Sequence, residues 1–401
     1  MSNRSLKRSD NKFNFDSLII LPVVFLALLG LIMVASASLA VAGKDFGSPL
    51  HFFSHQLIYM SMGLVLAFLC IRVSLEQWQK IAPWLLIATL IGLTLVLLPG
   101  IGKHINGAKR WIGLGFIHLQ VSEFAKLAMM LYLASYLTRR QYEVVASAWG
   151  FLKPLFVLVA IVILLLLEPD FGASTVIIIV SLGMMFLAGA PLDKFFCLVA
   201  IALTILTTLV VLAPYRIARV LNFLNPWDHA YGGGYQLTQA LMAFGRGEIF
   251  GVGLGNSVQK MFYLPEAHTD FLFAVIGEEL GLIGCIFVIL CYALLIARVL
   301  YLSRVALQKN MLFHSYLCYG ISLWLAFQSF VNMGVNIGLL PTKGLTLPFI
   351  SYGGSSLFVS SIIFAILLRI GHELKYSKYK ENKINCYKST TPVRRKRYAK
   401  V

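Results

Sequence analysis

Charged side chains are scarce in this sequence. Lys, Arg, Asp and Glu together make up only 13% of its 401 residues, and the acidic residues number 17. Soluble domains carry about 25% charged residues, whereas here 59% of residues are hydrophobic and the mean hydropathy is +0.80. The shortage of charge excludes a soluble globular domain and predicts an integral membrane protein.

Cysteine pairs and metal-ligand motifs are also lacking. The six cysteines include no CxxC pair and the eight histidines show no ligand spacing, which excludes a disulfide framework and a metal knuckle. The string GVGLG has no strand–loop–helix context, so we do not interpret it as a nucleotide-binding loop. No nucleophile elbow is present either. The sequence predicts no metal site and no evident cofactor.

Basic residues outnumber acidic ones, 34 to 17, which gives a formal net charge of +17. Eleven of them fall within the last 33 residues. A basic tail beside a membrane span is typically a topology determinant or a contact for anionic lipids. The position of this charge beside a membrane span therefore favours a membrane role, and we predict no nucleic-acid partner.

Ten apolar runs are long enough to cross a bilayer, which takes about 17–25 residues. They are centred near residues 29, 65, 91, 129, 161, 181, 204, 283, 325 and 361. We predict an all-α polytopic protein with a single ten-helix transmembrane domain at 17–371, an N-terminal tail at 1–16 and a basic C-terminal tail at 372–401. The longest connection, at 214–269, lies between the seventh and eighth helices.

The basic residues also predict the orientation. With both termini inside, the inner segments hold 24 basic residues and the outer segments hold 9. Cytoplasmic segments carry the excess of Lys and Arg in membrane proteins. We therefore predict that both tails are cytoplasmic and that the longest loop faces outward.

Asp270 ends the long outer loop, in the string LPEAHTDFLFAVIGEELG, and opens the eighth predicted helix. The N-terminus of a helix favours an anion at this position. At about 100° per residue, small residues follow on its side of the helix: Ala274, Gly277, Gly281 and Gly284. This line of small residues predicts close helix packing or a groove for a lipid tail, and both can hold.

Four further charges lie inside the predicted spans: Glu123, Lys126, Glu278 and Glu279. Charges at such a depth are costly and are usually paired. We predict that Lys126 pairs with Glu278 or Glu279, which would make these charges mainly structural. The alternative is a proton or ion relay.

Cations gather in the outer segments, against the positive-inside trend. They include Lys109 and Arg110 in one segment and Lys343 in another. Each alone could be a solvated loop charge, but together they predict an anionic ligand at the outer surface. Phosphate or pyrophosphate is the natural candidate, because Arg and Lys bind such oxygens.

Long strings of this sequence closely resemble the SEDS family (shape, elongation, division and sporulation) of bacterial polytopic membrane proteins. The strings include GAKRWIGLG, EPDFG, NPWDHAYGGGYQLTQ, LPEAHTDF and NMGVNIGLLPTKGLTLPFISYGGSS. The match covers nearly all of the chain between the two tails. The wording PTKGLTLP favours the cell-division member of the family over its rod-shape paralogues.

The resemblance implies a ten-helix fold in the bacterial inner membrane, at the division septum. It also implies peptidoglycan glycosyltransferase activity on lipid II at the periplasmic face, with a class B penicillin-binding protein and other divisome membrane proteins as partners. Asp270 matches the family's proposed catalytic aspartate. We predict an inverting transfer in which Asp270 is the general base and some of Arg110, Lys109 and Lys343 stabilise the pyrophosphate.

Glu266, His268 and Asp170 are secondary candidates for contact with the substrate or with a metal. Mg²⁺ or Mn²⁺ could accompany the pyrophosphate, although no motif requires either ion. Two rival functions stay open: a flippase that moves lipid II across the membrane, and a non-catalytic scaffold that recruits a transpeptidase. Polar clusters at the outer mouth favour surface chemistry, because a transporter concentrates polar residues near the midplane.

Overall fold

The computed structural model describes residues 15–105, 108–114, 117–212 and 214–390. A long helix lies at each of the ten predicted spans. These helices are α1 (Ser17–Phe46), α2 (His51–Cys70), α3 (Leu75–Leu97), α4 (Val121–Ala146), α5 (Ala148–Leu167), α6 (Phe171–Leu187), α7 (Leu192–Val211), α10 (Leu272–Gln308), α11 (Leu312–Asn336) and α12 (Gly354–Thr390). The fold is therefore predominantly helical, as predicted.

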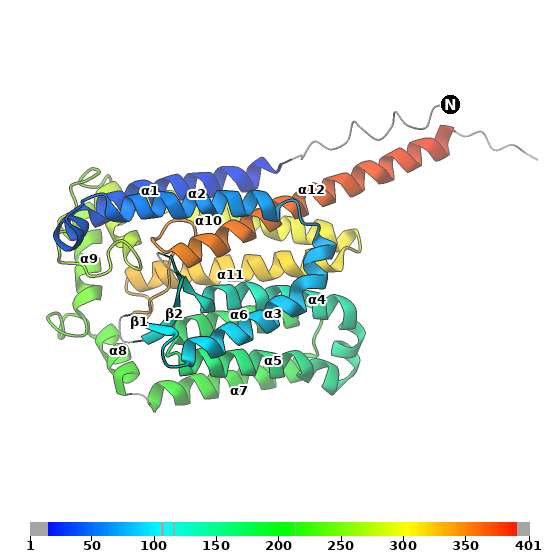
Figure 1. Ribbon diagram of the computed structural model, residues 1–401, viewed down its shortest axis with the longest axis horizontal. Coiled ribbons are helices and arrows are strands. Elements are labelled where there is room, and N and C mark those ends of the chain that lie inside the picture. The colour runs from blue at the N-terminus through cyan, green and yellow to red at the C-terminus, as the bar shows by residue number, and fades with distance from the viewer. Residues whose placement is uncertain (1–14, 106–107, 115–116, 213, 391–401) are drawn as a thin grey trace, which may run out of the picture.

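Six of the described helices contain a stretch long and apolar enough to cross a membrane, judged by length and composition: α1, α2, α3, α5, α10 and α12. Helix α6 is apolar but shorter, with 17 residues. In Figure 1 the start of α1 and the end of α12 leave the bundle at the same end. That arrangement fits two tails on one side of the membrane, while the number of crossings and the cytoplasmic position of the tails stay predictions.

Local sequence explains where several helices begin and end. The Asp16 side chain accepts the N–H of Leu18 at the start of α1, and Gly47 ends that helix with a φ of 67°. Glycine adopts this left-handed conformation without strain. At the start of α3, Ser74 and Gln77 each bond the other's backbone N–H. This capping box satisfies amides that the first turn leaves free.

A small antiparallel sheet, which the all-α prediction did not include, occupies the connection between α3 and α4. Its strands β1 (Gly102–Ile105), β2 (Ala108–Leu114) and β3 (Ile117–Gln120) pair in chain order. The connection is too short to span a membrane, and strand pairing satisfies its backbone N–H and C=O groups. Figure 1 shows the sheet at the end of the bundle where α8 (Pro214–Leu224) and α9 (Tyr235–Gly247) lie.

Helix α10 is interrupted at Gly281, whose backbone is left-handed with φ 66° and ψ −164°. A break of this kind removes helical hydrogen bonds on both sides of it. The loop at 248–253 replaces them through four backbone hydrogen bonds of 3.0–3.2 Å: Leu282 N–H to Glu248 O, Ile283 N–H to Ile249 O, Val252 N–H to Glu278 O and Gly253 N–H to Glu279 O. The long connection between α7 and α10 is thereby joined to the short first part of α10, at 272–280.

The line of small residues on α10 serves close packing. The ring of Phe244, from α9, fills the space beside Gly277, and the backbone of Gly251 lies against Gly281. The packing interpretation is therefore confirmed at these two positions. Protein covers both of them, so an open lipid groove does not lie beside either one.

Candidate active site

Asp270 lies just before α10, two residues ahead of the first residue of the helix. Its main-chain carbonyl accepts hydrogen bonds from two side chains of α11, Asn332 at 3.0 Å and Asn336 at 2.9 Å. The side-chain oxygen of Asn336 in turn accepts the N–H of Ala274, in the first turn of α10, at 3.0 Å. Helix α11 thus holds the backbone that carries this carboxylate.

The segment between α11 and α12 passes directly over the Asp270 carboxylate. A Cβ atom added at Gly344 would lie 2.8 Å from Asp270 Oδ2, so a side chain at this position would have to displace the carboxylate. Burial raises the pKa of Asp270 to about 7, the Glu266 charge adds to the rise, and Arg110 opposes it. Near neutral pH the carboxyl group is therefore close to half ionised, which suits a general base.

Arg110, on β2, connects the sheet to the loop between α5 and α6. Its guanidinium donates to the carbonyl oxygens of Glu168, at 3.2 Å, and Pro169, at 2.5 Å. Its charge acts on the carboxyl groups of both Asp270 and Glu168. Successive side chains of a strand point to opposite faces, so Lys109 points away from the face that presents Arg110.

Lys343 directly precedes Gly344 and lies near the start of α6. Its ammonium group is 4.5 Å from the centre of the Phe171 ring, a distance typical of a cation–π contact. Asp170, next to Phe171, accepts the N–H of Ala173 at 3.1 Å and so caps α6. The structure thus brings Lys343 and Asp170 to the same helix end.

Glu168 is a site residue that the sequence reasoning missed, although the string EPDFG contains it. The residue is fully buried, and neither carboxylate oxygen has a hydrogen-bond partner among the described residues. Burial, together with the negative charge of Asp170, raises the pKa of Glu168 to about 8, and Arg110 opposes the rise. The sequence signal was an acidic residue between two apolar runs.

His268 and Glu266 lie in the loop that leads to Asp270. The His268 ring packs 4.4 Å from the ring of Phe52 and 5.6 Å from that of Tyr352, measured between centroids. Burial lowers the pKa of His268, and the Glu266 charge opposes this. The Glu266 carboxylate is exposed and accepts the Thr269 hydroxyl at 2.7 Å. His268 is thus part of an aromatic cluster, and Glu266 reaches Asp270 through its charge.

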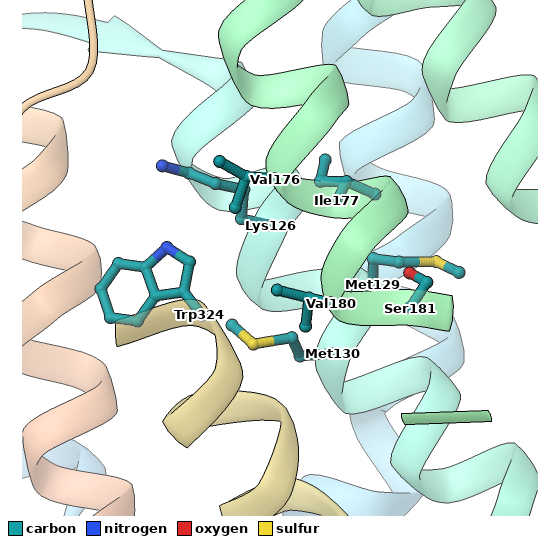
Figure 2. Close-up of a pocket in the computed structure, with 8 residues that line it drawn as sticks. All are labelled: Lys126, Met129, Met130, Val176, Ile177, Val180, Ser181 and Trp324. Atoms are coloured by element: carbon teal, nitrogen blue, oxygen red, sulfur yellow. The ribbon is translucent and has the colours of Figure 1, made fainter. Parts of the chain in front are cut away.

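The predicted pairing of Lys126 with Glu278 or Glu279 was wrong. Lys126 instead donates to Glu123, at 2.8 Å, and to the amide oxygen of Gln328 on α11, at 2.9 Å. Its ammonium group also lies 5.8 Å from the Trp324 ring centre. Figure 2 shows the Lys126 side chain above the Trp324 ring, beside a small pocket lined mainly by apolar side chains of α4 and α6.

Glu278 and Glu279 pair with side chains of the connection between α7 and α10 and of α1. Glu279 accepts Lys260 at 2.7 Å and the hydroxyl of Ser36, from α1, at 2.7 Å. Glu278 pairs with Arg246 of α9 at 3.3 Å. Periodicity along a helix could not predict these partners, because the fold of the loop brings them there. The four charges are nevertheless paired, as the cost of burying an ion requires.

The structure brings some of the predicted site residues together and places the others in different clusters. Asp270, Arg110 and Asp170 lie near Glu168 and the segment at 343–346, where carboxylates and cations gather at one end of the bundle. Glu123, Lys126, Glu278 and Glu279 belong to two other clusters. Such an arrangement can take a proton at a carboxylate and can stabilise an anion beside it.

Comparison with known proteins places the chain among relatives. It matches the model of the Cell cycle protein family, FTSW_RODA_SPOVE, over residues 16–376. The protein of Coxiella burnetii described as a probable peptidoglycan glycosyltransferase FtsW is 52% identical over 92% of this chain and 99% of its own length. The protein of Legionella pneumophila with the same description is 50% identical over 90% of this chain and 92% of its own length.

Solved structures have the same fold. A chain from the work described as "Structural coordination of polymerization and crosslinking by a peptidoglycan synthase complex" aligns with a TM-score of 0.73 at 30% identity, covering 90% of this chain and 98% of that one. The rod shape determining protein RodA of Thermus thermophilus aligns with a TM-score of 0.67 at 29% identity, with the same coverage. The matches agree with the resemblance seen in the sequence strings, and the chain belongs to the Cell cycle protein family of FtsW, RodA and SpoVE.

Proposed function

We propose that this chain is a peptidoglycan glycosyltransferase that polymerises lipid II into glycan strands during septal wall synthesis. The observation that carries the proposal is the partly buried Asp270 carboxylate, with a pKa raised to about 7, beside the charge of Arg110. The names of its relatives support the reaction class. Septal location and a periplasmic active site are part of the proposal.

The reaction requires one inversion. The donor sugar of lipid II is α-linked to pyrophosphate and the product bond is β-1,4, so a single displacement at the anomeric carbon suffices. The acceptor 4-hydroxyl oxygen forms the new bond as the bond to the pyrophosphate oxygen breaks. Asp270 takes the hydroxyl proton, and the electron pair leaves with undecaprenyl pyrophosphate. A positioned base contributes roughly 10²–10⁴ in rate.

The departing pyrophosphate needs positive charge. We assign this role mainly to Arg110, which bonds the Glu168 carbonyl, and to Lys343, which lies over the Phe171 ring. Preorganised cations at a leaving group stabilise the transition state without reorganising. Lys109 contributes less, because it points away from Arg110 on β2.

A divalent cation with the pyrophosphate stays part of the proposal. Within the ranges that the structure describes, no three His, Cys, Asp or Glu side chains come together to hold a metal. Mg²⁺ commonly takes its ligands from substrate phosphates, water and one or two carboxylates. The test is polymerisation after treatment with EDTA, with Mg²⁺ or Mn²⁺ added back.

The proposed partner is a class B penicillin-binding protein that crosslinks the new glycan, together with other divisome membrane proteins. A structural relative belongs to a peptidoglycan synthase complex, which supports a transpeptidase partner for this chain. An integral membrane polymerase and its transpeptidase would then act on the same strand.

Reconstitution with lipid II and the cognate transpeptidase tests the function. Wild type should build glycan chains, whereas Asp270→Ala and Asp270→Asn should fold and bind the partner yet build none. Polymerisation by both variants would disprove the catalytic role of Asp270. Movement of lipid II across vesicles without polymerisation would favour a flippase, and partner recruitment alone would favour a scaffold.

A further inference from the structure

Helix α11 carries three amide side chains at four-residue intervals: Gln328, Asn332 and Asn336. Residues four apart lie on the same face of a helix. All three side chains are buried, with exposed fractions of 0%, 2% and 0%. Burying an amide costs free energy unless it forms hydrogen bonds, so the partners of this amide row explain its presence.

Two members of the row hold the backbone at Asp270. Asn332 and Asn336 both donate to the Asp270 carbonyl, at 3.0 and 2.9 Å. Asn336 also accepts the N–H of Ala274 at 3.0 Å. One side chain therefore binds the residue before the helix and an amide of its first turn, which sets the direction in which α10 leaves Asp270.

The same row holds the segment that passes over the carboxylate. Asn332 donates to the carbonyl of Leu345 at 2.6 Å, and Gln328 donates to that of Thr346 at 2.8 Å. These residues directly follow Lys343 and Gly344. Asn332 is bonded to both sides of the site at once, because its amide group reaches Asp270 and Leu345 together.

An ion pair at the inner end of the row orients its first amide. Lys126 donates to the Gln328 side-chain oxygen at 2.9 Å and to Glu123 at 2.8 Å. A lysine can only donate hydrogen bonds, so the Gln328 NH₂ group must point the other way, toward Thr346. Through Gln328, the buried ion pair of α4 therefore helps to hold the segment at 343–346.

We propose that Asn332 and Asn336 are positioning residues that set the distance between the Asp270 carboxylate and the segment at 343–346. The proposal rests on the function proposed above, in which Asp270 is the base and Lys343 helps to stabilise the pyrophosphate. Misplacing a reacting group by about 1 Å can cost roughly 10²-fold in rate. Hydrogen bonds from the same helix to the Asp270 backbone and to the segment at 343–346 limit such misplacement.

A disulfide reports the distance without reference to activity. A Cβ at Gly344 would lie 3.8 Å from the Asp270 Cγ. The sulfur of a cysteine at position 270 would lie near the place of that Cγ. The double variant Asp270→Cys with Gly344→Cys should therefore crosslink readily. The protein used for crosslinking also carries Cys197→Ser and Cys386→Ser, so that neither of these cysteines competes for the disulfide. We expect Asn332→Ala or Asn336→Ala to slow crosslinking by about tenfold or more, because a disulfide needs its two cysteines within a narrow range of separation.

Ser329→Ala is the matched control. Ser329 is also a buried polar residue of α11, but its hydroxyl donates to Leu325 of the same helix at 2.6 Å. The crosslinking rate in this variant should equal that of the parent. Asn336→Ser and Asn332→Ser, which keep a shorter donor, should recover part of the rate that the alanine variants lose.

Kinetics supply the second readout, with Asp270 and Gly344 intact. Asn332→Ala and Asn336→Ala should lower kcat about 10–100-fold, while KM for lipid II stays near the wild-type value, since the substrate contacts are unchanged. Ser329→Ala should match wild type. A merely structural loss would instead reduce the amount of folded protein and leave kcat per folded molecule unchanged.

The outcomes separate the two proposals. Crosslinking rates and kcat values equal to the parent in folded alanine variants would overturn the positioning role. Where the alanine variants do not accumulate, the serine variants decide by the same criterion. If the alanine substitutions slow crosslinking but the wild-type protein polymerises no lipid II, the positioning role is supported and the glycosyltransferase function is refuted.

Discussion

The guanidinium of Arg110 donates to the main-chain carbonyl of Glu168 over 3.2 Å, while the carboxylate of that same glutamate is buried without a hydrogen-bond partner in the described structure. Arginine thus fixes the backbone of the loop between α5 and α6 and leaves the acidic group unsatisfied. An unpaired buried carboxyl group avoids the cost of its charge by keeping its proton.

Replacing Glu168 should therefore stabilise the protein in a defined pH window. The usual glutamate pKa is 4.5, whereas burial and Asp170 raise that of folded Glu168 to about 8. Between these values the unfolded chain releases a proton that the folded chain keeps, so stability falls as pH rises and levels off above about 8. Glu168→Gln removes this loss. Its gain in Tm over wild type should grow across the window, and a gain independent of pH would contradict the assignment.

The charge of Glu266 should contribute to the pH at which polymerisation begins. Asp270 must be ionised to act as a base, so activity should rise with pH through about 7, the raised pKa of its carboxyl group. Glu266 contributes to that rise, second to burial. Glu266→Gln should shift the acid limb of kcat/KM to lower pH. Glu76→Gln, on an exposed side chain of α3, is the control and should leave the limb in place.

The two neighbouring cations of β2 should differ in importance. Arg110 bonds two carbonyl oxygens and acts on Asp270, whereas Lys109 points to the other face of the strand. Arg110→Ala should lower kcat by about 10²–10³, the loss typical of one electrostatic stabiliser. Arg110→Lys should restore little of it, because an ammonium group cannot form the same fork. An equal loss in Lys109→Ala would show that the pyrophosphate lies elsewhere.

Sequence patterns predicted the helices well because each span needs its own apolar run. The position of Asp270 just before a helix could also be predicted, since a long apolar segment begins at Leu272. Strands in a short polar connection, such as Ala108–Leu114, left no comparable signal, because a membrane does not constrain their length. Sequence therefore predicts the helices of the bundle better than the strands and loops that cover one of its ends.

Side-chain partners were harder to predict than side-chain positions. Lys126 is buried, as expected, but it bonds to Glu123 and Gln328 because α11 lies beside α4. Its predicted partner Glu279 is instead reached by Lys260, from a loop whose path has no periodicity to read. Asn332 and Asn336 offered a signal that could have been used, since amides four residues apart are unusual in an apolar span.

The Lys260–Glu279 pair should contribute strongly to the stability of the connection between α7 and α10. Both side chains are almost completely buried, at 4% and 0% exposed, and their charged atoms are 2.7 Å apart. Lys260→Met leaves Glu279 buried without its cation, which should cost about 3–5 kcal/mol. Lys80→Met breaks an exposed pair with Glu76 and should change Tm far less, because exposed ion pairs contribute little to stability. Adding Glu279→Gln to Lys260→Met should recover part of the loss, whereas no recovery would argue against a charge effect.

Gly281 should tolerate no side chain, because the hydrogen bonds between the loop at 248–253 and α10 depend on its conformation. Its φ of 66° lies in the left-handed region, and an added methyl group would overlap the backbone of Gly251 and Ile249. Gly281→Ala should therefore separate the loop at 248–253 from α10, lower Tm and expose the loop to proteases. Gly245→Ala is the matched control: this helical glycine of α9 has nothing within 4 Å of an added Cβ. Because alanine favours a helix over glycine by about 1 kcal/mol, that variant should be as stable as wild type or more so. Equal protease resistance in the two variants would mean that the interruption of α10 does not depend on the glycine.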